Sequence, residues 1–325
     1  MKPEFWCMAV FLITILAVTP PPESEGSPAP AGERYGFTPR WGASAVRLSN
    51  GTVVVTGGFS GEDVGTTEIY HPVSRKWTRA ASDPHLRTSA SAVPLPDDTV
   101  LVIDGYNGHY LQTNEIFDPV RNRWKKITSD PVPRGGGEAS LLANGDVFVT
   151  GGFNDTGYLD SSEIFRPRSG LWRLLHPDPV PHWASVVVTL NDGNVLVVGG
   201  YNSQTLGLPE RYDPGSDTWK TVAPDPVPRW GASAVLLPSG NVLVIDGYHG
   251  KYLKTSEIYS PLKNTWTRVA SDPTPREKAI AVLLSDGRVL VEGGLNPGGF
   301  TSVGEIYNPR TDKWTNLPSP NSTTP

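Results

Sequence analysis

The chain has 325 residues, of which 34 are glycine and 32 are proline, and this composition is typical of many short strands joined by tight turns. Its 28 basic and 33 acidic residues give a formal net charge of -5, which argues against nucleic acid or an anionic membrane surface as a partner, since both need a basic face. We expect a monomer without stable membrane insertion.

The first predicted element is an apolar run of 14 residues over 5–18, which follows Lys2 and precedes a Pro-rich stretch. This run is too short to span a bilayer with ease, so we interpret residues 1–26 as a signal peptide, with cleavage between about residues 19 and 32. A retained amphipathic anchor is the alternative. A lead-in rich in proline and serine follows over 27–39, and we expect a secreted protein, extracellular or periplasmic.

Removal of this peptide would take away Cys7, Met1 and Met8, which are the single cysteine and both methionines. The processed chain would then form no disulfide and hold no thiolate nucleophile or metal ligand. Its stability would have to come from a hydrophobic core.

A unit of 47 or 48 residues is repeated six times along the rest of the chain. Each copy carries a Gly-Gly or Asp-Gly pair, then a glutamate two positions before an aromatic residue, then a proline five positions before a tryptophan. The pairs are Gly57-Gly58, Asp104-Gly105, Gly151-Gly152, Gly199-Gly200, Asp246-Gly247 and Gly293-Gly294. The copies fall at about residues 40–82, 87–129, 134–177, 182–224, 229–271 and 276–318, and we expect a disordered tail over 319–325.

Each copy predicts four short strands and no helix. In the fifth copy they run from Gly231 to Leu237, Val242 to Gly247, Thr255 to Tyr259 and Thr265 to Val269. Pairs such as Asn50-Gly51 tolerate the positive φ of a tight hairpin between the first two strands. The second strands are apolar on both faces, so each small sheet must be buried between two others.

This succession of apolar strand, Gly-Gly pair, Glu-x-aromatic and Trp resembles the kelch repeat over residues 40–318. The resemblance implies an all-β fold, a six-bladed kelch-type β-propeller with four antiparallel strands per blade. Asp104 and Asp246 depart from the pattern by replacing the first glycine. Blade one would close the ring by packing on blade six, reinforced by Tyr35 to Phe37.

The links between copies combine a repeated Asp-Pro with a basic residue that enters the next first strand. Asp before Pro is a turn former. The basic residues form a ring of five arginines and one histidine, which would either make a positive funnel for an anionic ligand or pair with the six repeated glutamates. We favour pairing, since a charge inside a propeller needs a partner. The ring consists of Arg40, Arg87, Arg134, His182, Arg229 and Arg276.

Aromatic residues follow the link residues and the Gly-Gly pairs. In kelch propellers that bind peptides these positions line one face, and the resemblance implies an aromatic mouth here. The predicted ligand-binding residues are Trp41, Trp183, Trp230, Phe59, Tyr106, His109, Phe153, Tyr201, Tyr248 and His249. Rigid apolar faces with polar tips suit a protein or carbohydrate ligand, so a binding module is our first interpretation. The alternative for each ring is simple packing against neighbouring blades.

Catalysis is the second interpretation, as an isomerase, epimerase or lyase that needs no cofactor. Candidate acid-base residues are Glu277, His182, Asp104 and Asp246. A copper oxidase of the galactose-oxidase type would need a Cys-Tyr cross-link that the processed chain cannot form. The six histidines show no short-range ligand spacing, so we expect no metal.

Three sequons, at Asn50, Asn154 and Asn321, predict glycosylation if the source is eukaryotic. Asn154 falls in the loop between the second and third strands of copy three, beside the predicted mouth. A glycan there would shift ligand binding to the other side of the ring.

Overall fold

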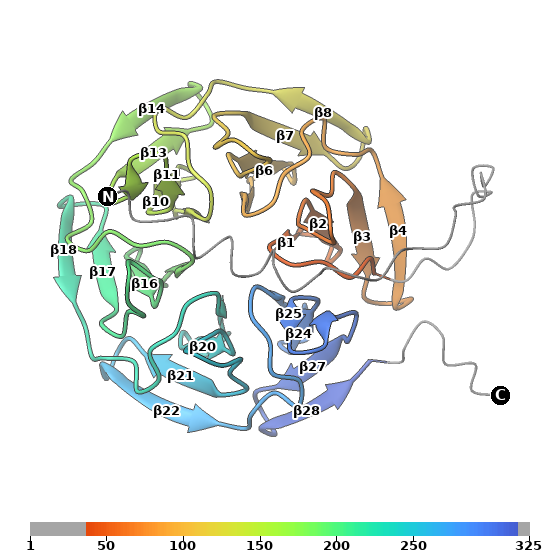
Figure 1. Ribbon diagram of the computed structural model, residues 1–325, viewed down its shortest axis with the longest axis vertical. Coiled ribbons are helices and arrows are strands. Elements are labelled where there is room, and N and C mark those ends of the chain that lie inside the picture. Colours follow the sequence, from red (N-terminus) through yellow and green to blue (C-terminus); the bar gives the residue numbers. More distant parts are fainter. Residues whose placement is uncertain (1–36, 318–325) are drawn as a thin grey trace. The chain divides into compact units, whose positions relative to one another are not determined.

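The computed structural model describes residues 37–317, which form six blades around a common axis (Figure 1). The predicted signal peptide, most of the lead-in and the tail lie outside the described residues. No helix occurs between residues 37 and 317, and hence none that is long and apolar enough to cross a membrane.

Every blade is a four-stranded antiparallel sheet in which the strands follow one another from the axis to the rim. Blade 1 contains β1 (Ser44–Arg47), β2 (Val53–Thr56), β3 (Thr67–His71) and β4 (Lys76–Ala80). Blade 2 contains β5 (Ser91–Pro94), β6 (Val100–Ile103), β7 (Asn114–Asp118) and β8 (Arg123–Lys126). Blade 3 contains β9 (Glu138–Leu141), β10 (Val147–Thr150), β13 (Ser162–Arg166) and β14 (Leu171–Leu174).

The other three blades repeat this order. Blade 4 contains β15 (Val186–Thr189), β16 (Val195–Val198), β17 (Glu210–Asp213) and β18 (Thr218–Thr221). Blade 5 contains β19 (Ser233–Leu236), β20 (Val242–Ile245), β21 (Ser256–Ser260) and β22 (Thr265–Val269). Blade 6 contains β23 (Ile280–Leu283), β24 (Val289–Glu292), β27 (Glu305–Asn308) and β28 (Lys313–Asn316). The predicted six-bladed, all-β propeller is confirmed.

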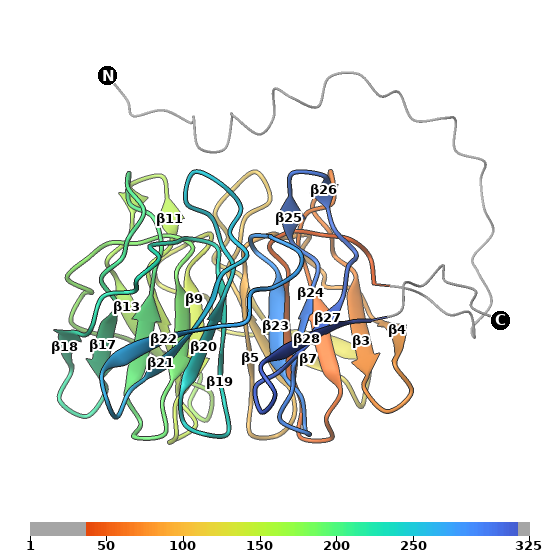
Figure 2. The ribbon, with the colours of Figure 1, turned by 90° about the horizontal axis from the view of Figure 1, so that it is seen from below.

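Two short hairpins that the sequence did not predict rise from the same end of the ring (Figure 2). They are β11 (Phe153–Asn154) with β12 (Gly157–Tyr158) and β25 (Leu295–Asn296) with β26 (Gly299–Phe300). This end also carries the other loops between second and third strands, and we call it the loop face. The opposite end carries the tight turns between first and second strands, and we call it the turn face.

The core lies between the blades, because the second strand of each sheet is buried along its whole length. Leu243 and Ile245 of blade 5, for example, pack in one cluster with Val289 and Val291 of blade 6. Burying one such side chain contributes about 1.5–3 kcal/mol, so each blade depends on its neighbours for most of its stability.

The repeated tryptophans pack the rim of every blade and join blades 2 to 6 to the blade before each of them. In every blade the indole packs against the aromatic residue of the third strand, as Trp124 does on Phe117 with ring centroids 5.1 Å apart. In blades 2 to 6 the indole N–H also donates to a backbone carbonyl of the preceding blade, for example from Trp124 to Ala81 at 2.8 Å. One side chain thereby fills the rim and links two sheets.

The ring closes by packing alone between blades 1 and 6. Phe37 enters the cluster that holds Val55 of blade 1 and Ile280 of blade 6, and its ring lies 5.1 Å from that of Trp77. The backbone N–H of Gly294 donates to the carbonyl of Arg40 at 3.0 Å across the same boundary. The predicted role of Phe37 is confirmed, whereas Tyr35 lies outside the described residues.

Six backbone hydrogen bonds encircle the axis near the loop face, and we call them the axial ring. Each first strand is preceded by a residue with a φ between 52° and 67°, whose N–H donates to the carbonyl of its counterpart in the preceding blade. The bond that crosses from blade 1 to blade 6, from Gly42 to Lys278, is the longest at 3.4 Å. The ring consists of Gly42, Ser89, Gly136, Ala184, Gly231 and Lys278.

Candidate functional site

The predicted mouth residues do come together at the loop face, because backbone pairs fix them there. In blade 1 the Trp41 N–H donates to the Phe59 carbonyl at 2.9 Å, and the Phe59 N–H donates back at 2.8 Å. The same bridge recurs in the other blades. Its remaining pairs are Thr88 with Tyr106, Gly135 with Phe153, Trp183 with Tyr201, Trp230 with Tyr248 and Glu277 with Leu295.

Aromatic rings form a continuous chain across blades 2 to 5, which we call the aromatic arc. Successive ring centroids are between 5.0 and 6.4 Å apart, a spacing typical of favourable aromatic pairs. The arc runs through Tyr106, Tyr110, Phe153, Tyr158, Tyr201, Trp230, Tyr248 and Tyr252, with Trp183 stacked beside Trp230. Trp230 is buried and the other rings are half-buried, so they pack between blades and still present a face outward.

The remaining predicted mouth residues complete this surface. His109 and His249 are exposed in the loops of blades 2 and 5. Phe59 pairs with Phe300 of the β25–β26 hairpin, with centroids 6.0 Å apart. Trp183 lies over Gly136, where an added Cβ would come within 2.2 Å of its Nε1, so a glycine is required there.

Of the four predicted acid-base residues, the structure places Glu277 at the mouth. Its backbone pairs with Leu295, and its carboxyl group is buried. Burial raises the pKa of Glu277 to about 8, while the Lys278 ammonium and the Trp41 indole N–H oppose the rise. The carboxyl is therefore largely protonated at neutral pH.

Asp104 and Asp246 do not lie at the mouth; they are buried between blades. The Arg134 Nε lies 3.6 Å from the Asp104 carboxylate, and the Arg276 Nε lies 3.9 Å from that of Asp246. Burial raises the pKa of both carboxyl groups well above the usual value, and the neighbouring Asp130 or Asp272 adds to the rise. Both residues belong to inter-blade charge clusters.

The predicted pairing of arginine with glutamate is confirmed in five of the six blades between residues 37 and 317. In blade 5 the buried Arg229 guanidinium contacts Glu257 and Asp225 and also donates to the carbonyls of Asp246 and Thr255, both at 3.1 Å. Because these donors are already engaged with the protein, the arginine ring is no funnel for an anionic ligand.

Blade 4 is the exception, because His182 takes the place of arginine. The His182 ring is buried, with its Nε2 3.2 Å from Asp178 and its Nδ1 2.8 Å from the Ser185 hydroxyl. Among residues 37–317 no cationic side chain pairs with Glu210, and burial together with Asp178 raises its pKa strongly. The predicted acid-base residue His182 therefore lies inside the blade and not at the mouth.

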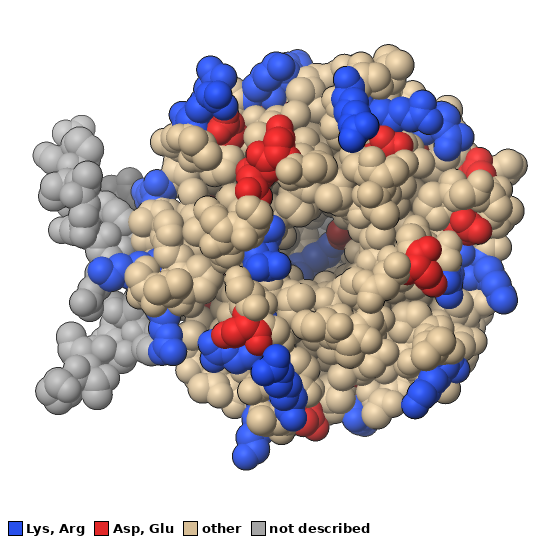
Figure 3. Space-filling view, turned by 180° about the vertical axis from the view of Figure 1, so that it is seen from behind, with Lys and Arg blue, Asp and Glu red and all other residues tan. Residues whose placement is uncertain are grey.

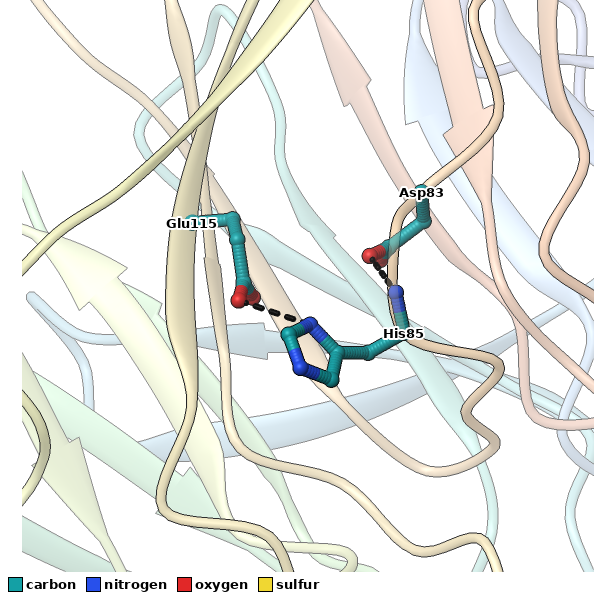
Figure 4. A group of neighbouring side chains, drawn as sticks. All are labelled: Asp83, His85 and Glu115. Carbon is teal, nitrogen blue, oxygen red and sulfur yellow. Dashed lines mark hydrogen bonds and ion pairs between the residues drawn. The ribbon is translucent and has the colours of Figure 1, made fainter.

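Asp83, His85 and Glu115 form the one group of side chains in the described part of the chain that has the spacing of metal ligands (Figure 4). The His85 Nδ1 lies 2.8 Å from Glu115, and its backbone N–H donates to Asp83. Arg87 already contacts both carboxylates, which leaves little negative charge for a cation. His85 occupies the position from which Thr38 and Thr274 donate to the glutamates of blades 1 and 6, so we interpret it as a hydrogen-bond donor.

The sequons differ in their surroundings. Asn50 is exposed at the turn face, and its side-chain oxygen accepts from Thr52. Asn154 is buried, and its amide nitrogen donates to the Pro133 carbonyl at 2.9 Å, a bond that a glycan would replace. Asn321 lies outside the described residues.

Two residues that the sequence analysis did not select, Glu138 and Lys278, line a cavity on the axis. The sequence does distinguish these two residues, because a charged residue occurs at each position in one copy only. The equivalent positions of the other copies hold small or apolar residues. These are Ser44, Ser91, Val186, Ser233 and Ile280 for Glu138, and Gly42, Ser89, Gly136, Ala184 and Gly231 for Lys278.

Six blades of four antiparallel strands, with the same glycine, glutamate and tryptophan pattern in each, define a β-propeller of the kelch type. The Kelch motif family model matches residues 40–84, 182–226 and 279–321, and the chain is a kelch-repeat β-propeller. A solved structure described as "Structure of YjhT" is 17% identical, with a TM-score of 0.71, and the match covers 86% of this chain and 98% of that one. No curated protein matches the chain.

Proposed function

We propose that this propeller is a binding module whose partner, a protein segment or a carbohydrate, docks on the aromatic arc. The continuity of the arc is the observation that carries the proposal, because it presents rigid aromatic faces together with several tyrosine hydroxyl groups. The paired backbone under each ring keeps the surface in place before a ligand arrives, which lowers the entropy cost of binding.

The test is a screen of the full chain against a glycan array and a peptide library, followed by titration of each hit with two variants. Tyr106→Ala and Tyr248→Ala remove equivalent half-buried rings from blades 2 and 5, and we expect each to weaken binding at least tenfold. Leu262→Ala, at a position that is 94% exposed and outside the arc, is the matched control. Hits that bind both tyrosine variants as tightly as the wild type would contradict the proposal.

Glu277 supports a second candidate function, proton transfer on a ligand held at the same mouth. A carboxyl group whose pKa is about 8 can donate and accept a proton near neutral pH. The measurement is NMR detection of deuterium uptake from D₂O into sugar acids, with Glu277→Gln as the inactive variant. Equal uptake by the wild type and the variant would exclude this role.

We also infer secretion, which rests on the apolar run over residues 5–18. Expression of the full chain followed by N-terminal sequencing should give a new terminus between about residues 19 and 32. An exported protein that keeps residue 1 would instead support the retained anchor.

A further inference from the structure

A cavity of about 200 Å³ lies on the propeller axis, and we call it the axial channel. The first strands of all six blades and the residues just before them line it, mostly with glycine, alanine, serine and valine. Figure 3, which views the turn face, shows the central hollow with basic and acidic side chains inside it. Glu138 and Lys278 are the two ionisable residues among those that line the channel.

These two side chains lack close partners of opposite charge. Within residues 37–317 no hydrogen bond or salt bridge reaches the Glu138 carboxylate or the Lys278 ammonium, although the ammonium is attracted by both Glu138 and the neighbouring Glu277. The ammonium lies over the Trp183 ring, 5.4 Å from its centroid. The Glu138 carboxylate and the Lys278 ammonium therefore form no direct ion pair with each other.

Their placement matches the two ends of a small dipolar molecule. Glu138 belongs to blade 3 and Lys278 precedes blade 6, and these blades face each other across the axis (Figure 1). The walls between them offer small apolar groups and few free donors, because the axial ring uses its own N–H groups and the Ser44 and Ser233 hydroxyls donate to backbone carbonyls. Both side chains are half-buried. A charge that has lost part of its water is stabilised by a counter-charge, so a ligand that supplies both counter-charges gains from both.

We propose that the axial channel binds a small zwitterion of the α-amino acid class, with its ammonium on Glu138 and its carboxylate on Lys278. A volume of about 200 Å³ is ample for an amino acid with a short side chain. The central hollow is open on the turn face (Figure 3). The channel adjoins the aromatic arc where the Lys278 ammonium lies over Trp183. The inference does not depend on the proposed function.

Burial raises the pKa of Glu138 to about 7, and Lys278 opposes the rise. A bound ammonium would favour the ionised carboxylate, so the unliganded site exchanges a proton for the ligand's positive end. Lys278 has its pKa lowered by burial, and a bound carboxylate would favour its charged form in the same way.

The experiment is calorimetric titration of the full chain with glycine and L-alanine, compared with acetate and methylammonium, which each carry one of the two charges. We expect both amino acids to bind at least tenfold more tightly than either ion. Glu138→Gln should weaken L-alanine binding at least tenfold and leave acetate unchanged, whereas Lys278→Met should weaken both. Glu62→Gln, an exposed carboxylate outside the channel, is the matched control.

Absence of amino-acid binding would overturn the proposal, and so would wild-type affinity in both channel variants. Acetate that binds as tightly as L-alanine would also overturn it, because a simple anion site would then suffice. The melting temperature of each variant checks the fold, and a partner of the aromatic arc should bind Glu138→Gln as it binds the wild type.

Discussion

At the scale of single residues, the buried charge clusters dominate the electrostatics of the propeller. Each guanidinium neutralises a glutamate and also binds two backbone carbonyls, so it replaces most of the water that it loses on burial. Pairing of arginine with glutamate was predictable from the repeat, because both residue types recur in five copies at the same spacing.

We predict that Arg229→Met destabilises the protein by about 3–5 kcal/mol, because Glu257 and Asp225 remain buried without a counter-charge. Arg288→Met removes an exposed pair with Asp286 and should cost at most about 1 kcal/mol. Urea unfolding at pH 7 measures both. Similar midpoints for the two variants would show that the buried cluster contributes little.

The histidine of blade 4 leads to a prediction with a defined dependence on pH. Restoring the residues of the other blades, as His182→Arg with Ser185→Ala, gives Glu210 a cationic partner. In the wild type the pKa of Glu210 is raised above its unfolded value, so the folded state keeps a proton that the unfolded state releases as pH rises. Wild-type stability therefore falls with increasing pH between these two pKa values.

The double variant should escape this loss, and its advantage should grow from pH 5 to pH 8 by at most about 1.4 kcal/mol per pH unit for one group. Urea midpoints at several pH values measure the difference. A constant or shrinking advantage would mean that Glu210 does not carry the proton.

At the scale of strands and loops, period and turn residues were enough to place the four strands of each blade. In blade 5 the observed β20 and β22 begin at the predicted residues, Val242 and Thr265. The β11–β12 and β25–β26 hairpins were not predicted, because two-residue strands carry no hydrophobic period. They depend on Gly157 and Gly299, which adopt φ values of 117° and 104°.

We expect the rim tryptophans to differ in what their indole N–H contributes. Trp124→Phe loses the bond to Ala81 and should destabilise the protein by about 1 kcal/mol more than Trp77→Phe. Within residues 37–317 the Trp77 indole N–H donates to no other group, although its ring packs on Tyr70 as that of Trp124 does on Phe117 and also contacts Phe37. Thermal unfolding of the two variants provides the comparison, and equal losses would contradict it.

At the scale of the whole molecule, the number of blades could be predicted by counting the repeats. The proximity of Glu138 and Lys278 on the axis could not be predicted in this way. Glu138 and Lys278 are 140 positions apart in the sequence and meet in one cavity because six blades close into a ring. The residues of the aromatic arc could be predicted from their positions within one repeat. Glu138 and Lys278 could not, because they come from two different repeats and share no motif.

Each of blades 1 and 6 is built from one continuous stretch of chain, so no strand of one end completes the blade of the other. We therefore expect the boundary between these two blades to open more readily than the other boundaries. Among the six N–H groups of the axial ring, that of Gly42 makes the longest hydrogen bond, at 3.4 Å, and should exchange with solvent fastest. Hydrogen exchange followed by NMR should show roughly tenfold less protection for Gly42 than for Gly136, after correction for intrinsic rates. Equal protection would mean that the ring opens at no preferred boundary.

The axial ring also determines which groups can give the channel its electric field. Its six peptide dipoles follow one another head to tail around a circle, so their vector sum nearly vanishes and they create no macrodipole of the kind that a helix directs at its ends. A molecule on the axis therefore meets a backbone that is polar locally but without a preferred pole. The orientation of any charged guest is then left to the two side chains that break the sixfold repeat.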